Sequence, residues 1–402
     1  MELATRLPQP LIPIIHLLEA QGAAVYLVGG CVRDHLLGKK PTDFDLEVYH
    51  MSLEKLHQTL RQFGKCDVVG KQFGIIKLFN LREVDFALPR IETKNGLGHR
   101  DFTVEVNPDL EIKEACRRRD FTMNAILYRV VTNEFIDPYG GIEDIKNKVI
   151  RIVDQNTFIE DPLRVYRLVQ FVSRLDFQVE TKTQLLCKEM IDKQMLVHLS
   201  VERIEAELKK MLLSQKPWLG MQLLEEFEIL PIQSVEIEVL KKASQYKVYS
   251  LNPYGFMWSA CLMNEKNSDY IKSILKLKRL SNYVEANKQF IDVLQTIDSK
   301  SSYFQLLALI NGKTTINDLY YLRKCKPLSS FNEDLFKVNY IDRYGIQMQE
   351  PLITGDDLIT VGFRAGKQMK NLLEEAYGLQ LKGYSKEKIL KILKRGNEDG
   401  TK

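Results

Sequence analysis

Several kinds of feature are missing from these 402 residues, and each absence excludes a class of protein. No segment approaches the roughly 18 uncharged apolar residues of a membrane span, and the N-terminal stretch lacks the layout of a signal peptide. The six cysteines form no CxxC pair and the six histidines are dispersed, which argues against a disulfide framework or a zinc site. We expect a cytoplasmic protein with no membrane partner.

Charge of one sign is also scarce, because 57 basic and 53 acidic residues leave a net charge of only +4. That balance does not by itself predict a nucleic-acid partner. Basic residues do cluster at 116–120 ("CRRRD") and 388–396 ("KILKILKRG"). Such clusters are typical either of a solvated surface or of a track for phosphates.

The length predicts more than one domain, and the pattern changes near residue 150. Before it, strand-like runs (24–30, 43–49, 74–80, 83–90) alternate with helix-like runs (9–21, 31–38, 52–64), which predicts a small mixed sheet with helices. Residues 90–115 show no clear period, and we interpret them as a long mobile loop. After residue 150 helical spacing dominates, as in 161–175, 182–195, 201–213 and 218–230. The fold class is therefore α+β, an N-terminal head followed by an all-α remainder.

Two carboxylates stand out in "PTDFDLEV", at Asp43 and Asp45. On a strand this spacing directs both side chains to one face and Phe44 to the other. Neighbouring carboxylates repel unless a proton or a cation intervenes, and magnesium suits oxygen ligands together with substrate phosphates. Asp85, on another predicted strand, is available as a third acid. A surface strand with solvated acids is the alternative.

A glycine turn precedes this pair, because Gly29 and Gly30 end one strand-like run and begin a helix-like one. Backbone N–H groups at such a turn hold phosphate oxygens, and Arg33, one helical turn further, is placed to reach the same anion. A plain strand-to-helix turn is the alternative. A glycine turn and a carboxylate pair so close together indicate a site for phosphate and metal more specifically than either feature alone.

The stretch "LVGGCVRDHLLGKKPTDFDL" (27–46) resembles the signature of polymerase-β-type nucleotidyltransferases, in particular the class II tRNA nucleotidyltransferase and bacterial poly(A) polymerase family. The resemblance implies a polymerase-β-like head and a catalytic site of Asp43, Asp45 and Asp85. It also implies two magnesium ions on Asp43 and Asp45, which join an RNA 3′-hydroxyl to the α-phosphate of a nucleoside triphosphate.

Two later motifs extend the resemblance. "RRDFTMNAI" (118–126) places Asp120 as a helix N-cap on physical grounds, and the resemblance implies that Arg119 and Asp120 select a ribonucleotide. In "EDPLRVYR" (160–167) the resemblance implies an amino-acid template, in which Asp161 and Arg164 accept cytosine and adenine. An ordinary N-cap with Pro162 at the first helical position is the alternative for Asp161. The expected nucleotide-binding set is Gly29, Gly30, Arg33, Arg118, Arg119, Asp120, Asn124, Glu160, Asp161, Arg164 and Arg167.

We expect a catalytic head (1–140), a helical neck with the template helix (141–215), and a helical body and tail that bind tRNA (216–402). The expected activity is addition of CCA to tRNA from CTP and ATP. The alternatives are A addition after a separate CC-adding enzyme, a poly(A) polymerase, and an RNA-binding protein with an inactive nucleotidyltransferase fold. The full-length 90–115 segment favours CCA or A addition over CC addition, and no His-Asp phosphohydrolase motif is present.

Overall fold

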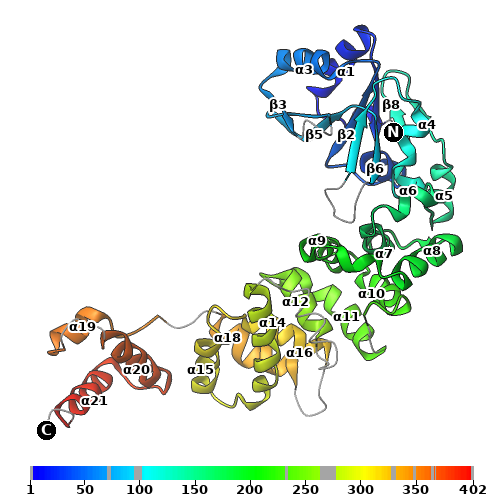
Figure 1. Ribbon diagram of the computed structural model, residues 1–402. Helices are drawn as coiled ribbons and strands as arrows, with labels where there is room; N and C mark the ends of the chain where they lie inside the picture. The colour runs from blue at the N-terminus through cyan, green and yellow to red at the C-terminus, as the bar shows by residue number, and fades with distance from the viewer. Residues whose placement is uncertain are drawn as a thin grey trace. The chain divides into compact units, whose positions relative to one another are not determined.

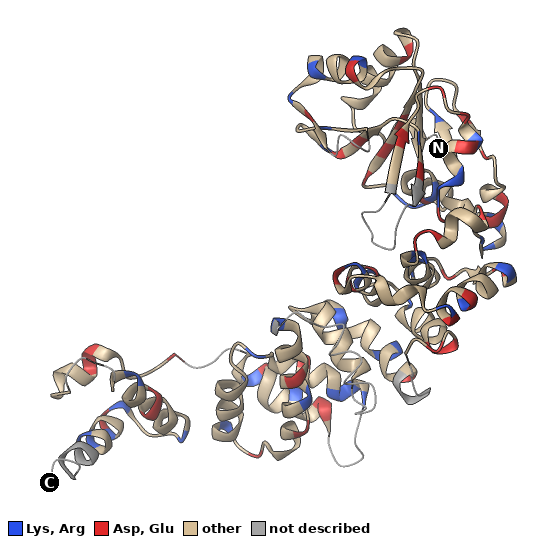
Figure 2. Cartoon of the chain, in the orientation of Figure 1, with Lys and Arg blue, Asp and Glu red and all other residues tan. Residues whose placement is uncertain are grey.

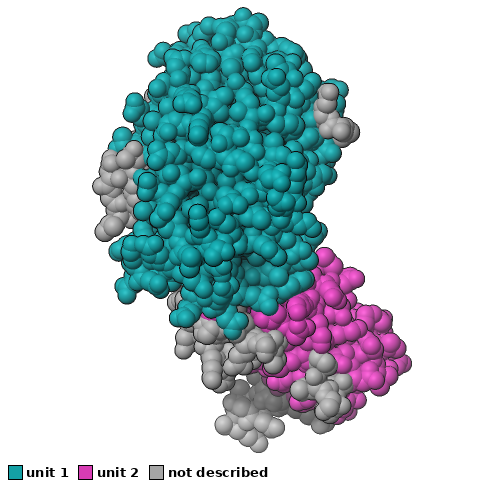
Figure 3. Space-filling model, turned by 90° about the vertical axis from the view of Figure 1, so that its right-hand side faces the viewer, with its two compact units in different colours: residues 1–229 teal, residues 230–402 magenta. Residues whose placement is uncertain are grey.

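The computed structural model describes residues 3–69, 74–94, 102–230, 234–262, 278–326, 332–346, 350–363, 366 and 368–399. These residues form two compact units, Met1–Ile229 and Leu230–Lys402, which are coloured separately in Figure 3. The predicted boundaries near residues 140 and 215 stay a proposal. Within the described residues, no helix combines the length and the apolar character needed to cross a membrane.

A seven-stranded sheet organises the first unit, with the order β3-β4-β5-β2-β1-β8-β9. Several of its strands, among them β2, β3, β5 and β8, are labelled in Figure 1. β2 and β5 are parallel and the other neighbours are antiparallel, so the predicted mixed sheet is confirmed. The strands are β1 (Ala24–Val28), β2 (Phe44–Tyr49), β3 (Cys66–Val69), β4 (Ile75–Leu78), β5 (Leu81–Ala87), β8 (Leu127–Arg129) and β9 (Glu134–Ile136).

Amphipathic helices accompany this sheet, namely α1 (Leu11–Ala20), α2 (Gly30–Leu36) and α3 (Leu53–Leu60). All five residues of β1 are buried, and Leu56 and Leu60 of α3 are fully buried. Ser52 caps α3 by accepting a hydrogen bond from the Lys55 N–H. The apolar positions of strands and helices thus form the core that fixes the strand ends.

The prediction of an irregular loop over residues 90–115 is wrong for its described part. Strands β6 (Arg90–Lys94) and β7 (Phe102–Val106) pair antiparallel, and helix α4 (Ile112–Arg117) follows. Apolar residues do alternate here, since Ile91 in "RIETK" and Val104 and Val106 in "FTVEV" occupy every second strand position. The alternation was not identified because charged residues lie among these apolar ones. The part of this segment at 95–101 lies outside the described residues.

Helices make up most of the remaining chain, as predicted. The rest of the first unit contains α5 (Gly141–Asn147), α6 (Gln155–Ile159), α7 (Leu163–Leu175), α8 (Thr181–Asp192), α9 (Val201–Leu212) and α10 (Pro217–Glu226). One short parallel pair, β10 (Val149–Ile150) with β11 (Gln178–Val179), was not predicted. The second unit contains α11 (Ser234–Tyr246), α12 (Pro253–Cys261), α14 (Lys278–Phe290), α15 (Lys300–Ile310), α16 (Ile316–Cys325), α17 (Glu333–Phe336), α18 (Asp342–Tyr344), α19 (Gly355–Thr360), α20 (Met369–Leu381) and α21 (Lys386–Asp399).

Candidate functional site

Neighbouring strands of the sheet bring the predicted carboxylates together. Asp45 on β2 lies directly opposite Asp85 on the parallel strand β5. Phe44 is buried, whereas Asp43 and Asp45 on either side of it are exposed. Asp43 immediately precedes β2 and Asp45 lies within it, and the charge of Asp43 acts on Asp45. That the two side chains share one face stays a prediction. Figure 2 shows acidic positions along the strands of this sheet.

Burial and neighbouring charges affect the ionisation of Asp45. Desolvation raises the pKa of Asp45, the Arg119 guanidinium opposes this rise, and the carboxylates of Asp85 and Asp43 add to it. Lys77 on β4 offsets one of these charges, because its Nζ lies 2.8 Å from Asp85 Oδ1. Across the residues that the structure describes, Asp43 and Asp45 form no ion pair with a lysine or arginine. A nearby cation would therefore stabilise their ionised forms.

This donor set fits a hard divalent cation at Asp43 and Asp45. Exposed carboxylate oxygens are the ligands that magnesium prefers, and the ion usually keeps water and substrate phosphates as further ligands. Within the described ranges, no group of three or more His, Cys, Asp or Glu side chains is arranged to hold a metal. The arrangement thus offers two protein carboxylates and leaves further positions to phosphate and water.

The glycine turn lies beside the pair, because Val28, the last residue of β1, pairs with Asp45. Gly29 has a φ of 71°, which side chains rarely adopt, and it precedes the first turn of α2. A Cβ on Gly29 would lie 3.1 Å from Arg119 Nη1. The absence of a side chain on Gly29 thus lets its backbone lie close to both a guanidinium and the carboxylates.

Arg33 is held inside the protein at this turn. Its side chain is nearly fully buried, and Nη1 donates to Asn124 Oδ1 at 2.7 Å. Nε and Nη2 both donate to Asp34 Oδ1, at 2.9 and 2.7 Å. Arg33 and Asn124, predicted separately, are therefore direct partners. The predicted contact of Arg33 with a phosphate remains a proposal.

Glu47 joins the two arginines of the second motif, and the sequence prediction missed it. Its Oε1 accepts hydrogen bonds from Arg118 Nη2 at 2.8 Å and Arg119 Nη2 at 2.7 Å. Burial would raise the pKa of Glu47, but Arg119 and Arg118 lower it below the ordinary value. Glu47 is two residues beyond Asp45, so strand alternation already placed it on the same face.

Asp120 does not cap a helix, so that prediction is wrong. Phe121 precedes a single 3-10 turn at Thr122–Asn124, and Asp120 Oδ2 accepts from Arg167 Nε at 2.8 Å. Asp120 Oδ1 accepts from Asn124 Nδ2 at 2.9 Å. Burial would raise the pKa of Asp120, but the Arg167 guanidinium and the Asn124 amide lower it to about 2. The ion pair, which spans two motifs, determines the conformation of this carboxylate.

The third motif places Asp161 and Arg164 with different partners at the start of α7. Asp161 Oδ1 accepts from Arg203 Nη2, at 3.2 Å, on α9. Arg164 donates to the Thr157 carbonyl at 2.8 Å and to the Arg118 carbonyl at 2.5 Å. Arg203 was missed because nothing in its helical pattern distinguishes it from a surface cation.

The ends of the neighbouring helices complete this motif. Glu160 is the C-cap residue of α6. Pro162, for which the alternative was the first helical position, is instead the N-cap residue of α7, so the helix begins one residue later. Asp161 Oδ1 also accepts from the Leu163 N–H at 3.3 Å. Asp161 therefore contacts both the helix start and α9.

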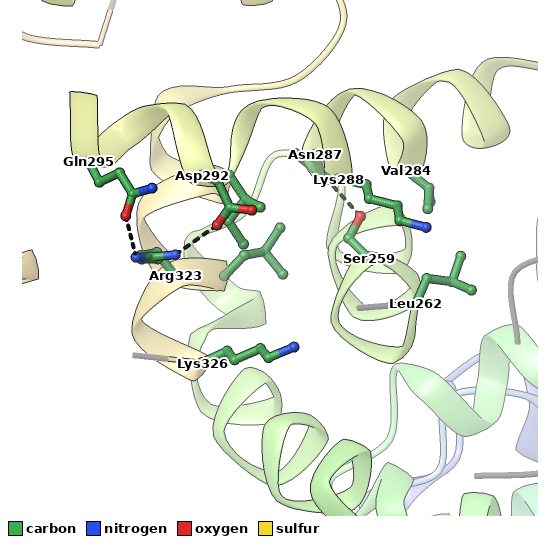
Figure 4. Close-up of a pocket in the computed structure, with 11 residues that line it drawn as sticks. Ser259, Leu262, Val284, Asn287, Lys288, Asp292, Gln295, Arg323 and Lys326 are labelled. Atoms are coloured by element: carbon green, nitrogen blue, oxygen red, sulfur yellow. Dashed lines mark hydrogen bonds and ion pairs between the residues drawn. The ribbon is translucent and has the colours of Figure 1, made fainter. Parts of the chain in front are cut away.

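A cavity of about 480 Å³ lies elsewhere, in the second unit (Figure 4). Its lining includes Ser259, Asn287 and Arg323, and Arg323 Nη1 donates to Asp292 Oδ1 at 2.9 Å. None of the residues predicted for the site lines it. The candidate site is therefore the carboxylate pair with its surrounding arginines.

Two family models match this chain. Residues 25–151 match the poly A polymerase head domain, and residues 176–233 match the probable RNA and SrmB-binding site of polymerase A. The first match contains the carboxylates, the glycine turn and the "RRD" motif.

Curated relatives match over about half of the chain. A "Multifunctional CCA protein" of Stenotrophomonas maltophilia is 36% identical over 219 residues, which cover 54% of this chain and 52% of the relative. A protein of the same name from Xanthomonas campestris is 39% identical over 196 residues, 48% of this chain and 46% of the relative. The matched stretch thus spans about half the length of these relatives.

Solved structures show the same fold over nearly the whole chain. The CCA-adding enzyme of Bacillus stearothermophilus in complex with CTP has a TM-score of 0.74 at 23% identity, covering 98% of this chain and 99% of that one. The Thermotoga maritima CCA-adding enzyme complexed with tRNA has a TM-score of 0.69 at 22% identity, covering 98% and 97%. At this identity the likeness shows the fold alone, which is the predicted head followed by helices.

Proposed function

We propose that this chain is a member of the class II tRNA nucleotidyltransferase and poly(A) polymerase family, and that it adds CCA to the 3′ end of tRNA from CTP and ATP. The observation that carries the proposal is the exposed Asp43–Asp45 pair beside the Gly29–Gly30 turn. A protein that only binds RNA has no need to hold two repelling carboxylates together. The inactive-fold alternative is therefore disfavoured.

The reaction forms a bond between the RNA 3′-hydroxyl oxygen and the α-phosphorus of the triphosphate. The bond from that phosphorus to the leaving oxygen breaks, pyrophosphate departs, and the hydroxyl proton passes to water. Two magnesium ions on Asp43 and Asp45 would stabilise the attacking and leaving oxygens and lower the pKa of the 3′-hydroxyl. Gly29 and Gly30 give the triphosphate access to backbone N–H groups, and Arg119 adds positive charge next to them.

Selection of the nucleotide falls to the other motifs in this proposal. Asp120 keeps its negative charge at neutral pH, as an acceptor for a ribose hydroxyl requires. Asp161 accepts a hydrogen bond from the exocyclic amine of cytosine or adenine, as carboxylates do with the cytosine amino group. Arg164 donates to the neighbouring ring acceptor. Uracil and guanine present the reverse pattern and are refused.

A-adding activity is the second candidate, because the segment between β5 and α4 is not shortened.

Six free cysteines suit a reducing compartment, and we place the activity in the cytoplasm.

Three tRNA transcripts test the proposal, one ending before CCA, one after the first C and one after CC. Each is incubated with the protein, magnesium and labelled CTP and ATP, and the products are resolved at single-nucleotide length. Extension of all three to CCA is the expected result. Extension of the CC-ended transcript alone, by one A, supports the A-adding alternative. Long A tails on unstructured RNA point to a poly(A) polymerase, and no extension overturns the proposal.

A further inference from the structure

Three guanidinium groups surround one aromatic ring on helix α7. The Cζ atoms of Arg33, Arg167 and Arg174 lie 5.1, 5.6 and 5.8 Å from the centroid of the Phe171 ring. Phe171 is 3% exposed, so its ring faces are covered by these cations and the core. Each cation gains from the negative face of the ring, but three like charges in so small a volume repel one another.

Two of the three charges have a carboxylate partner. Arg33 pairs with Asp34 at 2.7 Å and Arg167 with Asp120 at 2.5 Å. Arg174 instead donates to the neutral Gln170 Oε1 at 3.3 Å, and among the described residues it forms no ion pair with a carboxylate. Glu207 on α9 acts on it electrostatically, but Glu207 is itself paired with Lys210 at 2.7 Å. Desolvation lowers the pKa of Arg174, and the charge of Arg33 adds to this, whereas the charges of Asp34 and Glu207 oppose it.

This group of guanidinium charges lies next to the glycine turn. A Cβ on Gly30 would be 3.7 Å from Arg33 Nη2, and Arg33 contacts the same ring as Arg174. Arg174 is itself exposed and so is open to a ligand. We infer that Arg174 is a phosphate-binding residue at the junction of α7 and the glycine turn, an inference that rests on the proposed function. Its phosphate comes either from the incoming triphosphate or from the 3′-terminal backbone of the RNA.

Arg174→Met tests this, because methionine keeps an apolar stem against Phe171 and removes the charge. Arg174→Lys restores a charge, and Lys182→Met, at an exposed position on α8, removes the same charge elsewhere. KM for CTP, KM for ATP, KM for tRNA and kcat are measured for each variant, with urea unfolding as the check on folding. Equilibrium binding of CTP without RNA gives a readout that does not depend on turnover.

We expect Arg174→Met to raise one of the three KM values roughly tenfold or more, as loss of a charge-assisted hydrogen bond does. Arg174→Lys should restore that KM in part, and Lys182→Met should leave all the constants unchanged. A rise in the nucleotide KM, with weaker CTP binding, identifies the triphosphate as the source of the phosphate. A rise in the tRNA KM alone identifies the RNA backbone. Unchanged constants in folded Arg174→Met overturn the inference, and Arg174→Gln replaces it if methionine prevents folding. If the unmodified protein binds CTP but extends no tRNA, the proposed function fails and the binding comparison still tests Arg174.

Discussion

Asp45 on β2 is the direct cross-strand partner of Asp85 on β5, and it also pairs with Val28 at the end of β1. One residue therefore joins the carboxylates to the glycine turn. The parallel pairing of β2 with β5 creates the first contact and the antiparallel pairing of β1 with β2 creates the second. The site is thus a product of strand register, and a slip of one residue would turn Asp45 into the core.

Removing the charge of Asp43 or Asp45 should strongly slow nucleotide addition. We expect Asp43→Asn and Asp45→Asn to lower the rate on the order of a hundredfold to a thousandfold, because metal-ion stabilisation of transition-state charge is worth several kcal/mol. The loss should be the same with CTP and ATP, since the carboxylates act on phosphate. Single-turnover extension of a CC-ended tRNA measures it.

Asp67→Asn, an exposed carboxylate on β3 of the same sheet, is the control and should retain full activity. Of the three site variants, Asp85→Asn should lower the rate of nucleotide addition least, because Lys77 already neutralises that carboxylate. Near-normal activity in Asp43→Asn would exclude the metal assignment.

The Asp120–Arg167 ion pair should make stability depend on pH in a defined direction. The folded pKa of about 2 lies below the ordinary value of 3.8, so the stabilisation is fully present above about pH 4 and is lost as pH falls through about pH 2. At 1.36 kcal/mol per pKa unit the contribution is on the order of 2 kcal/mol.

Urea unfolding at several pH values compares the parent protein with Asp120→Asn. The parent should lose stability more steeply between about pH 4 and pH 2. The variant should be less stable at neutral pH because it leaves the half-buried Arg167 without its carboxylate partner. Parallel pH curves for the two proteins would show that Asp120 is not ion-paired in solution.

The base-selection residues should separate rate from fidelity. Arg164→Ala should keep some transfer but weaken the choice of C and A over U and G. Arg203 donates to the Asp161 carboxylate at 3.2 Å, so Arg203→Met should act through Asp161. We expect the ratio of C to U incorporation to fall roughly tenfold, which is the cost of one charge-assisted hydrogen bond. Competition between CTP and UTP on one tRNA gives the ratio.

Lys209→Met, another cation on α9, is the control for Arg203→Met and should leave the ratio unchanged. An unaltered C-to-U ratio in both Arg164→Ala and Arg203→Met would remove the template role from this part of the chain.

Local patterns predicted the elements of this site better than they predicted its contacts. Two-residue alternation predicted that Asp43 and Asp45 share one face, and the same rule could have found Glu47. The hairpin β6–β7 was missed because charged residues alternate with its apolar ones. Arg33 and Asn124 are 91 residues apart, and no local pattern carries information about such a pair. Sequence gives the chemistry of a side chain, whereas its partner depends on tertiary packing.

The polar network at Asn287 should stabilise the second unit without affecting the chemistry of the first. Asn287 is 1% exposed, and its Nδ2 donates to Ser259 Oγ at 2.8 Å while its Oδ1 accepts from the Thr314 hydroxyl. Both Ser259 and Asn287 line the cavity of Figure 4. Asn287→Ala leaves two hydroxyl groups without this partner, at a cost of about 1–3 kcal/mol.

Urea unfolding followed by fluorescence of Trp258, which is fully buried in α12, should report this loss in a Trp218→Phe background. Asn282→Ala removes an exposed asparagine of the same helix and should leave the unfolding midpoint unchanged. Single-turnover addition to tRNA at a temperature where both variants are folded should match the parent, because Asn287 lies in the other compact unit from Asp43 and Asp45. Equal midpoints for Asn287→Ala and Asn282→Ala would mean that the buried amide adds no stability.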